Sequence, residues 1–556
     1  MGMGVKIMYA GGGQRASSPT LSRQSIDRAS SLRSLDKFTS RNLSYSPPPY
    51  HMTARTYFPV FGHQFCAAPA ANQRVRHAFN DKRLADNFDF LSTRMAQRKT
   101  VTVDRLVDDS RQRDAFLRFL HNDKVTLEEL IYQLTRMDPS LTTGRDVLLI
   151  TDACVIDVGL GRKRRNQLLK DVGAIGGKAT AGYTLMPCLV VDVNTDQCLG
   201  VSEIVQYSRP APSRNKKTVK RQRRERQKLP VLQKESGAWV TTSRGGATQL
   251  GSAIRRTAVM DQGGDVYGVL AHLLTAPEEL DVLVRSKYDR QAELDQPGGQ
   301  TVHERISAIM SRQEWRDQRE VQLRSLDHHS KTKPASPRRR RARTAKLNIR
   351  SASVVLQRPQ GADADLPPTL KVNVVEVVED AQTVPEGEKP IRWQIITSWP
   401  IDTLDQLWAV IDGYCQRWHI EQVFRVLKRD GLNLEASQLR GAQALKKLGV
   451  MSVKASVEVM QLVNGRDDVE TPSSLLFDEY DQKFLARQND YYEGNTVKQC
   501  NPHPEGTLAY AAWVIGRMGG WKGYASQKPA GPKRMQRGLQ EFRTQSALLR
   551  RINMIL

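Results

Sequence analysis

The spacing of apolar positions changes twice along this chain, and each change marks an expected domain boundary. Across residues 56–145 the apolar side chains recur at helical intervals, with basic residues between them. Across 146–435 they gather in short continuous runs, which are typical of buried strands. Helical spacing returns over 436–556. The pattern therefore predicts an α/β protein in which a strand-rich domain lies between two helical domains.

The strand-rich domain begins with three strands in succession, which indicate a meander, and then alternates helix and strand. Two of its strands end on aspartates, Asp152 and Asp261. Side chains at such strand ends reach the crevice outside a sheet, and a helix is expected from Asp265. The expected strands are 147–151, 182–193, 199–205, 257–261, 280–286 and 391–397.

The stretch at about 291–375 interrupts this alternation. It contains two further expected strands, 351–357 and 369–378, which are separated by a turn rich in Gly, Pro and Asp. We expect this stretch to form a β-rich insertion in the central domain.

A helix with a narrow polar face follows the last of these strands. Thr403 and Gln406 fit a capping box that starts the helix near Leu404, and Gly431 is a natural stop. An ordinary amphipathic helix explains such a face, and so does a metal-binding carboxylate between cations that hold phosphate. At about 100° per residue, the following four residues fall within a wedge of about 60°: Tyr414, Arg417, Glu421 and Lys428.

The charge of the chain points to a polyanionic partner. Lys plus Arg is 84 and Asp plus Glu is 59, so 84 − 59 gives a net charge of +25. Basic runs lie at 162–165, 214–228 and 338–346, and residues 1–55 have the composition of a disordered basic tail. Such runs mostly remain solvated or bind phosphate without sequence preference.

The remaining composition indicates a protein of the reducing cytoplasm, associated with the nucleoid. The six cysteines are scattered without a paired spacing, which argues against a disulfide framework. No apolar run approaches the roughly 18 residues of a membrane span. We therefore expect no membrane partner, and we expect no nucleotide cofactor because Gly11-Gly12-Gly13 lacks the Lys-Ser/Thr of a phosphate loop.

The pattern Tyr-x2-Arg-x3-Glu-x6-Lys resembles the signature of the insertion-sequence-four family of bacterial DDE transposases. Trp418 and Ile420 beside the signature residues also resemble that family. The resemblance covers roughly residues 74–545 and is strongest over 386–434. It implies a ribonuclease-H-like core, an N-terminal domain that binds transposon ends, and C-terminal helices that hold a homodimer.

For the N-terminal helical domain the residues alone leave two interpretations open. One is a DNA-binding domain with a basic face, and the other is a helical cap whose basic face is simply solvated. The segment Phe79-Asn-Asp-Lys-Arg-Leu-Ala85 resembles the family's end-recognition domain and favours DNA.

The resemblance also implies a chemistry. Asp152, Asp261 and Glu421 would form the catalytic triad and would bind two Mg²⁺ or Mn²⁺ ions, which prefer carboxylate oxygens. The protein would nick double-stranded transposon ends, pass through a DNA hairpin and join the ends to target DNA. Two alternatives are an inactive end-binding protein, such as a transposition inhibitor, and a nuclease of the same fold that cuts without joining.

Several residues are expected to contact DNA by the same resemblance. Tyr414, Arg417 and Lys428 would hold phosphates, and Trp393 would stack on a base that leaves the helix during hairpin formation. A strand residue buried in the core is the alternative for Trp393. The further matching positions are Arg285 and Lys287.

One block departs from the family pattern. Relatives usually have Asp-Arg-Glu-x-Asp after the fourth strand, whereas this chain has Asp261-Gln262-Gly263-Gly264-Asp265. The two acids remain, but the Arg-Glu pair is absent.

Overall fold

We analysed a computed structural model of the chain. It describes residues 79, 81–98, 100–158, 172–175, 180–209, 215–295, 301–325, 340–430, 432–524 and 527–552. The expected tail at 1–55, the basic run at 162–165 and the expected helix stop Gly431 lie outside the described residues.

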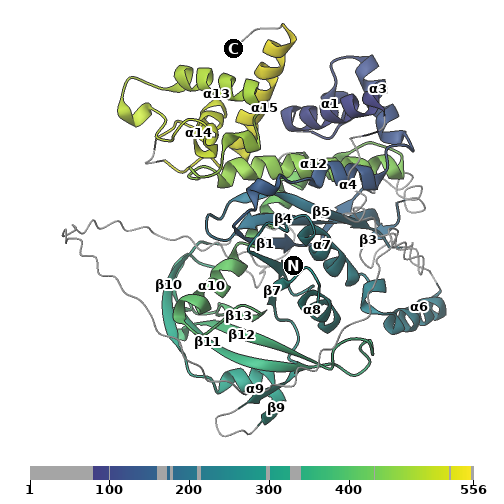
Figure 1. The fold of residues 1–556 in the computed structure, drawn as a ribbon, viewed down its shortest axis with the longest axis vertical. Coiled ribbons are helices and arrows are strands. Elements are labelled where there is room, and N and C mark those ends of the chain that lie inside the picture. The colour runs from purple at the N-terminus through teal and green to yellow at the C-terminus, as the bar shows by residue number, and fades with distance from the viewer. Residues whose placement is uncertain are drawn as a thin grey trace, which may run out of the picture.

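One mixed sheet crosses the middle of the molecule (Figure 1). Its strand β4 pairs antiparallel with both β1 and β5, so the predicted three-strand meander is confirmed. Strands β6 and β7 then run parallel to β1. The α/β class is therefore confirmed. These strands are β1 (Asp146–Thr151), β4 (Thr180–Asp192), β5 (Cys198–Tyr207), β6 (Arg255–Met260) and β7 (Leu280–Arg285).

The stretch expected to be a β-rich insertion extends the same sheet. Strand β13 pairs antiparallel with β7, and β12 and β11 follow it outward. Both strands expected in this stretch are present. The elements are β8 (Gln291–Asp295), β9 (Thr301–Arg305), α9 (Ile306–Ser311), β10 (Asp317–Leu323), β11 (Arg343–Gln357), β12 (Thr369–Glu379) and β13 (Arg392–Thr397).

Helices bury both faces of the sheet. Along β1, Val147 and Leu149 belong to one hydrophobic cluster, whereas Leu148 and Ile150 belong to the other. This alternation follows from the two-residue period of a strand, and it explains the continuous apolar run in the sequence. One face is covered by α7 (Gly237–Ala247) and α8 (Tyr267–Leu274), and the other by α4 (Leu127–Thr135) and α12 (Ala442–Asn464).

The N-terminal and C-terminal helices lie side by side beyond α12 (Figure 1). Helix α1 packs against both α12 and α15, so the two ends of the chain share one hydrophobic cluster. The last helix begins at Pro532, a residue type that is favoured at the first helical position. The helices are α1 (Lys82–Arg98), α2 (Val103–Leu106), α3 (Ser110–His121), α13 (Glu479–Tyr492), α14 (Leu508–Met518) and α15 (Pro532–Arg551).

The capping box before the signature helix is confirmed, but the single helix is wrong. Thr403 and Gln406 exchange hydrogen bonds of 3.2 and 3.1 Å, and the helix starts at Leu404. It ends at Cys415, and a turn at Gln416 and Arg417 separates it from the next helix. The segments are α10 (Leu404–Cys415), α11 (Trp418–Arg425) and a π-helical turn, η5 (Val426–Asp430).

Across the described part of the chain, the helices are all too short or too polar to span a lipid bilayer.

Candidate functional site

Asp152 and Asp261 lie at the same level on neighbouring strands. The parallel pairing of β1 with β6 sets Ile150 opposite Val259, and each aspartate comes two residues later. Asp152 falls in the break between β1 and β2 (Cys154–Asp157), which both pair with the same edge of β4. The β4 residues opposite this break, between Leu185 and Cys188, include Pro187. The break places Asp152 just beyond the carboxyl end of β1.

Arg417 joins the third acid to the first. Its guanidinium bonds to Asp152 Oδ2 at 3.0 Å, and it also forms an ion pair with Glu421 on α11. The residue is only 5% exposed, so this bridge lies inside the protein. The turn between α10 and α11 places Arg417 between the sheet and the helix, which one continuous helix would not do.

The three acids interact electrostatically. Burial raises the pKa of Asp152 to about 6, and the charges of Asp261 and Glu421 act in the same direction against the opposing effect of Arg417. For Arg417, burial disfavours the cation, but Tyr414, Asp152 and Glu421 outweigh it and raise its pKa. The structure thus joins Asp152 to Glu421 through Arg417, and it brings Asp261 close enough for its charge to act on Asp152.

A stack of aromatic and basic side chains adjoins this cluster. The rings of Trp393 and Tyr414 meet edge to face at 5.6 Å, and the Arg285 guanidinium lies 5.8 Å from the centre of the Trp393 ring. Burial raises the pKa of Tyr414, although Arg417 and Arg285 oppose that change. Trp393 is 7% exposed and Tyr414 is 5% exposed. The alternative of a buried core residue therefore describes Trp393 in this conformation, and any contact with a base requires its ring to become uncovered.

The two lysines expected at the site lie in different surroundings. Lys428 is on η5, and its Nζ forms an ion pair of 3.0 Å with Glu435. The turn at Gln416 separates Tyr414 from the other three signature residues. Between Arg417 and Lys428 the α-helix passes into the π-helical η5 at Val426, so the regular α-helical spacing on which the shared face was predicted ends there. Lys287 is exposed, and its backbone N–H donates to Asp265 Oδ2 at 2.5 Å.

In the block that departs from the family pattern, the two glycines Gly263 and Gly264 are packed closely against neighbouring side chains. A Cβ on Gly263 would lie 2.9 Å from Asp261 Oδ1 and 2.9 Å from the Trp239 ring. A Cβ on Gly264 would lie 2.6 Å from Met260 Cβ. Side chains at these two positions would therefore displace their neighbours, including a carboxylate of the site.

Asp265 is held by Arg290, a partner that the sequence pattern did not predict. This aspartate is fully buried, and it forms an ion pair of 2.5 Å with Arg290, which is also buried. The same carboxylate accepts hydrogen bonds from the N–H groups of Lys287 and Tyr288. Asp265 thus holds the turn that carries Lys287. No local pattern marks Arg290, because the pairing depends on the approach of two distant loops.

No protein-family model matches this chain. The family resemblance therefore rests on the signature residues themselves, and what it implies for function stays a prediction.

The expected metal site is not preformed among the described residues. Within them, no three His, Cys, Asp or Glu side chains are grouped closely enough to share a metal ion. The donor chemistry of Asp152, Asp261 and Glu421 nevertheless fits a hard divalent cation, since all three offer carboxylate oxygens. Arg417 now supplies the positive charge between Asp152 and Glu421.

The N-terminal basic face is partly neutralised from within. Arg94 and Arg98 both form ion pairs with Asp108, whereas Lys82 and Arg83 remain exposed. Arg74, Arg76 and Lys99, which complete the expected face, lie outside the described residues. Both interpretations of the N-terminal domain, a DNA-binding domain and a helical cap with a solvated basic face, therefore stay open.

Proposed function

We propose that the protein is a DDE transposase that cuts double-stranded transposon ends through a hairpin intermediate and joins them to target DNA. The observation that carries the proposal is that Arg417 bridges Asp152 to Glu421 while the charge of Asp261 also acts on Asp152, so three acids that are distant in sequence are electrostatically coupled. A buried carboxylate with a raised pKa and further acids beside it is typical of a functional site.

The arrangement of strands supports the same proposal. A three-strand meander is followed by two strands parallel to its first strand, and helices cover both faces. Acids stand at the carboxyl ends of β1 and β6, outside the sheet. A ribonuclease-H-like core in a transposase needs this rigid platform to hold its carboxylates.

The residues around the acids have roles that suit DNA. Arg417 presents two N–H groups to two carboxylates, and the same fork suits two oxygens of a phosphate. Arg285 adds positive charge beside the Trp393 ring, and Lys287, two residues further along the chain, is an exposed cation. When bound, two Mg²⁺ or Mn²⁺ ions held by Asp152, Asp261 and Glu421 would activate the attacking oxygen and neutralise the leaving one.

An inactive end-binding protein is the second candidate. The burial of Trp393, Tyr414 and Arg417 favours this candidate over a transposase. Hairpin formation would need these three side chains to contact DNA, and they can do so only after the structure opens. Joining activity also separates a transposase from a nuclease.

The decisive experiment uses a labelled duplex that carries the inverted repeat flanking the gene, with Mg²⁺. We expect nicks, then hairpins, then joined products. Glu421→Gln should abolish nicking, a loss of at least about 100-fold, and should leave duplex binding largely intact because the carboxylate would hold metal and a negative charge does not bind phosphate. Glu479→Gln, which neutralises a highly exposed acid on α13, serves as the control and should nick normally. Nicking by Glu421→Gln at a near-normal rate would refute the assignment, and binding by the wild-type protein without cleavage would favour the inactive binder.

A further inference from the structure

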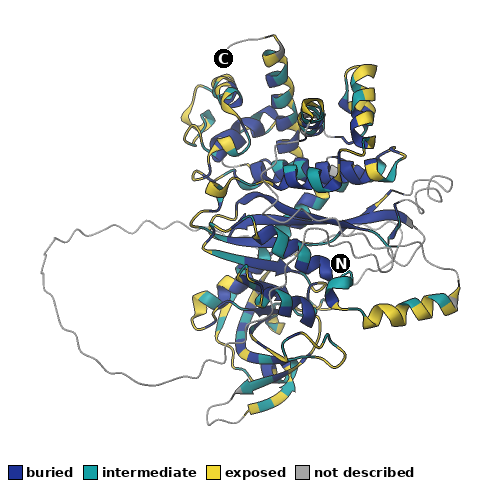
Figure 2. Cartoon of the chain, turned by 45° about the vertical axis from the view of Figure 1, so that its right-hand side comes forward, coloured by how far each residue is buried: buried dark blue, intermediate teal, exposed yellow. Residues whose placement is uncertain are grey.

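Helix α6 (Lys216–Lys228) has a composition that none of the roles above explains. Its thirteen residues, KKTVKRQRRERQK, contain eight Lys or Arg and a single acid, Glu225. Figure 2 shows it as an exposed helix at the edge of the molecule. Its described Lys and Arg side chains are all exposed, and Val219 is its only apolar residue.

The cations of α6 are almost unpaired within the protein. Among those whose side chains the structure describes, Arg221 alone has an acidic partner, Glu225 at 3.6 Å, and both side chains are exposed. Such a surface pair contributes little. The helix has a formal net charge of 8 − 1, or +7, and among the described residues no acid outside the helix forms an ion pair with it. Solvent or a bound partner must therefore neutralise most of this charge.

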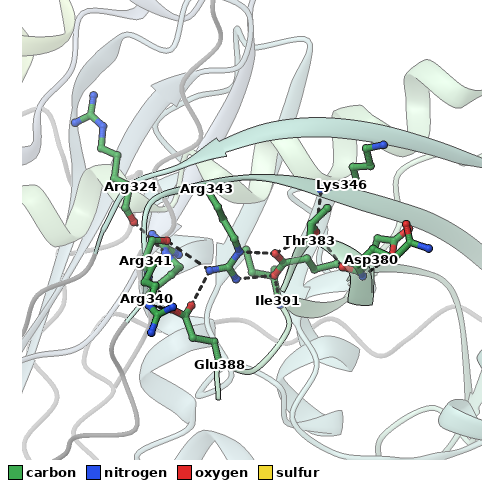
Figure 3. Close-up of polar contacts among 11 residues, drawn as sticks. Arg324, Arg340, Arg341, Arg343, Lys346, Asp380, Thr383, Glu388 and Ile391 are labelled. Carbon is green, nitrogen blue, oxygen red and sulfur yellow. Dashed lines mark hydrogen bonds and ion pairs between the residues drawn. The ribbon is translucent and has the colours of Figure 1, made fainter. Parts of the chain in front are cut away.

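Another basic run in the chain behaves differently (Figure 3). In the run at 338–346, the Arg343 side chain is 8% exposed and bonds to Glu379 at 2.6 and 2.9 Å and to Glu388 at 2.7 Å. This arginine ties β11 to β12 and to the loop before β13. A basic run that serves the fold thus has acidic partners in this protein, and α6 has no comparable set among the described residues.

The helix is stable only if something offsets its own repulsion. Cations four residues apart lie on the same face, as in Lys220 and Arg224 or Arg224 and Lys228, and such pairs destabilise a helix. Isolated helices of this length are marginal in water even without that repulsion. The Asn215 side chain caps the first turn through the N–H groups of Lys217 and Thr218, but this cap does not reduce the positive charge. Anions placed along the helix would remove the repulsion.

The distribution of charge selects the kind of anion. Thr218 and Gln222 are half-buried and mark the side that faces the body, while cations occupy the remaining directions around the axis. A membrane surface contacts one side of a helix and requires large apolar residues on that side, which α6 lacks. Single-stranded nucleic acid requires aromatic side chains for its bases to stack on, and α6 has none.

The remaining polyanion is a duplex. The major groove of B-form DNA is wide enough for a helix and has phosphates on both sides, whereas the major groove of A-form RNA is too narrow for one.

The chain that follows α6 is anchored in the body that carries the candidate site. Val231, three residues beyond the helix, is buried, and its N–H donates to Asp363 at 2.7 Å. The chain then enters α7, whose Trp239 lies against Gly263 beside Asp261. DNA bound along α6 would therefore be held by a segment that leads directly to the surroundings of Asp261.

We propose that α6 is an additional DNA-binding element, which grips the backbone of B-form duplex DNA without sequence preference. This inference rests on the proposed function for its partner, duplex DNA, and is independent of catalysis.

The test measures binding of the full chain to an arbitrary duplex of about 30 base pairs by fluorescence anisotropy, without metal, between roughly 50 and 200 mM salt. The variant replaces Lys220, Arg221, Arg223 and Arg224 by Gln. Because each lost phosphate contact lowers the slope of log K against log salt by about 0.9, we expect the slope to fall by about 3 to 4 and the affinity to fall at least tenfold at the lowest salt. Hydrogen exchange of residues 216–228 should slow when DNA is added to the wild-type protein.

A matched control removes the same number of charges elsewhere. It replaces four exposed lysines, Lys371, Lys483, Lys498 and Lys528, by Gln and should keep most of the slope. Lys217→Arg with Lys220→Arg should bind like the wild-type protein, since charge and not residue type is required.

Equal losses in the helix variant and the control would overturn the proposal in favour of the overall charge of the protein. An unchanged salt slope in the helix variant would also overturn the proposal. So would equal affinity of the wild-type protein for an A-form RNA duplex, or a helix variant that loses affinity only for vesicles of anionic lipid and not for DNA. The assay contains no cleavage step, so a failure here leaves the transposase proposal standing, and an inactive enzyme leaves this one standing.

Discussion

Asp152 is the residue at which the electrostatics of the site can be measured without DNA. Burial disfavours the ionised form of its carboxyl, and the charges of Asp261 and Glu421 add to that effect while Arg417 opposes it. The burial of Arg417 means that this crowding is built into the fold. The arrangement suits a site that must later accept more positive charge than one arginine supplies.

Asp152→Asn should therefore stabilise the protein at neutral pH. The pKa of Asp152 is raised from 3.8 to about 6 by folding, so the folded chain holds more protons than the unfolded chain between these values. The free energy of unfolding therefore falls as the pH rises from about 4 to about 6, and the full cost of ionising Asp152 in the folded protein remains above pH 6. We expect the variant to gain about 1–3 kcal/mol at pH 7.5 and to lose this advantage near pH 4, measured by urea unfolding.

Asp490→Asn removes an exposed acid on α13 and provides the control. Its stability should differ little from the wild type at both pH values. A stability of Asp152→Asn that is unchanged or lower at pH 7.5 would show that the charge of Asp152 is not destabilising and that the three acids are not crowded.

At the scale of elements, strand ends and turns position the residues of the candidate site. Asp152 lies in the break between β1 and β2, and Arg417 lies in the turn between α10 and α11. The turn after β7 is held by the buried pair of Asp265 and Arg290. Ion pairs thus contribute to the geometry of both turns.

Asp265→Asn should loosen the turn at 286–290. The amide has one acceptor oxygen in place of two, and it leaves the buried Arg290 without its counter-charge. We expect a loss of about 3 kcal/mol in unfolding free energy and faster hydrogen exchange confined to this turn. Asp289→Asn is the control, since it removes an exposed acid that bonds to Ser307, and it should cost about 1 kcal/mol or less. Equal protection of the turn in both variants would contradict the role given to Asp265.

On the scale of the whole molecule, the two helical parts behave as one layer. Helix α15 contacts α1, α12 and α14, so residues from both ends of the chain share a core. Phe542 lies near the centre of α15, is fully buried, and meets the rings of Phe477 at 5.2 Å and Phe484 at 5.0 Å. The N-terminal helices are therefore expected to depend on the C-terminal ones for stability.

Phe542→Ala should weaken both ends together. Removal of a buried ring leaves a cavity and should cost about 3–5 kcal/mol. We expect hydrogen exchange to accelerate in α1 as well as in α13 and α15, because these helices pack on one layer. An increase limited to α13 and α15 would show that the N-terminal helices fold independently. Leu548→Ala, at an exposed position on α15, should leave the exchange rates unchanged.

The local pattern of the sequence predicted the central strands and set Asp152 and Asp261 at strand ends, whereas the family resemblance singled out these two acids together with Glu421. The runs that bury β1, β4, β5, β6 and β7 are apolar on both faces, and strand preference acts over a few residues, so these strands were predictable. The Thr403 capping box was predictable for the same reason. Helix α6 was missed because its charges hide any periodicity.

Only the tertiary structure decided which of these residues meet. Asp152 and Asp261 are 261 − 152 = 109 residues apart, and their alignment follows from the pairing of β1 with β6, which no local pattern encodes. The bridge of Arg417, the burial of Trp393 and the pair of Asp265 with Arg290 likewise depend on how distant segments pack. Local dihedral preferences shape an element, whereas contacts across the chain arise from strand register and packing, and these belong to the folded molecule as a whole.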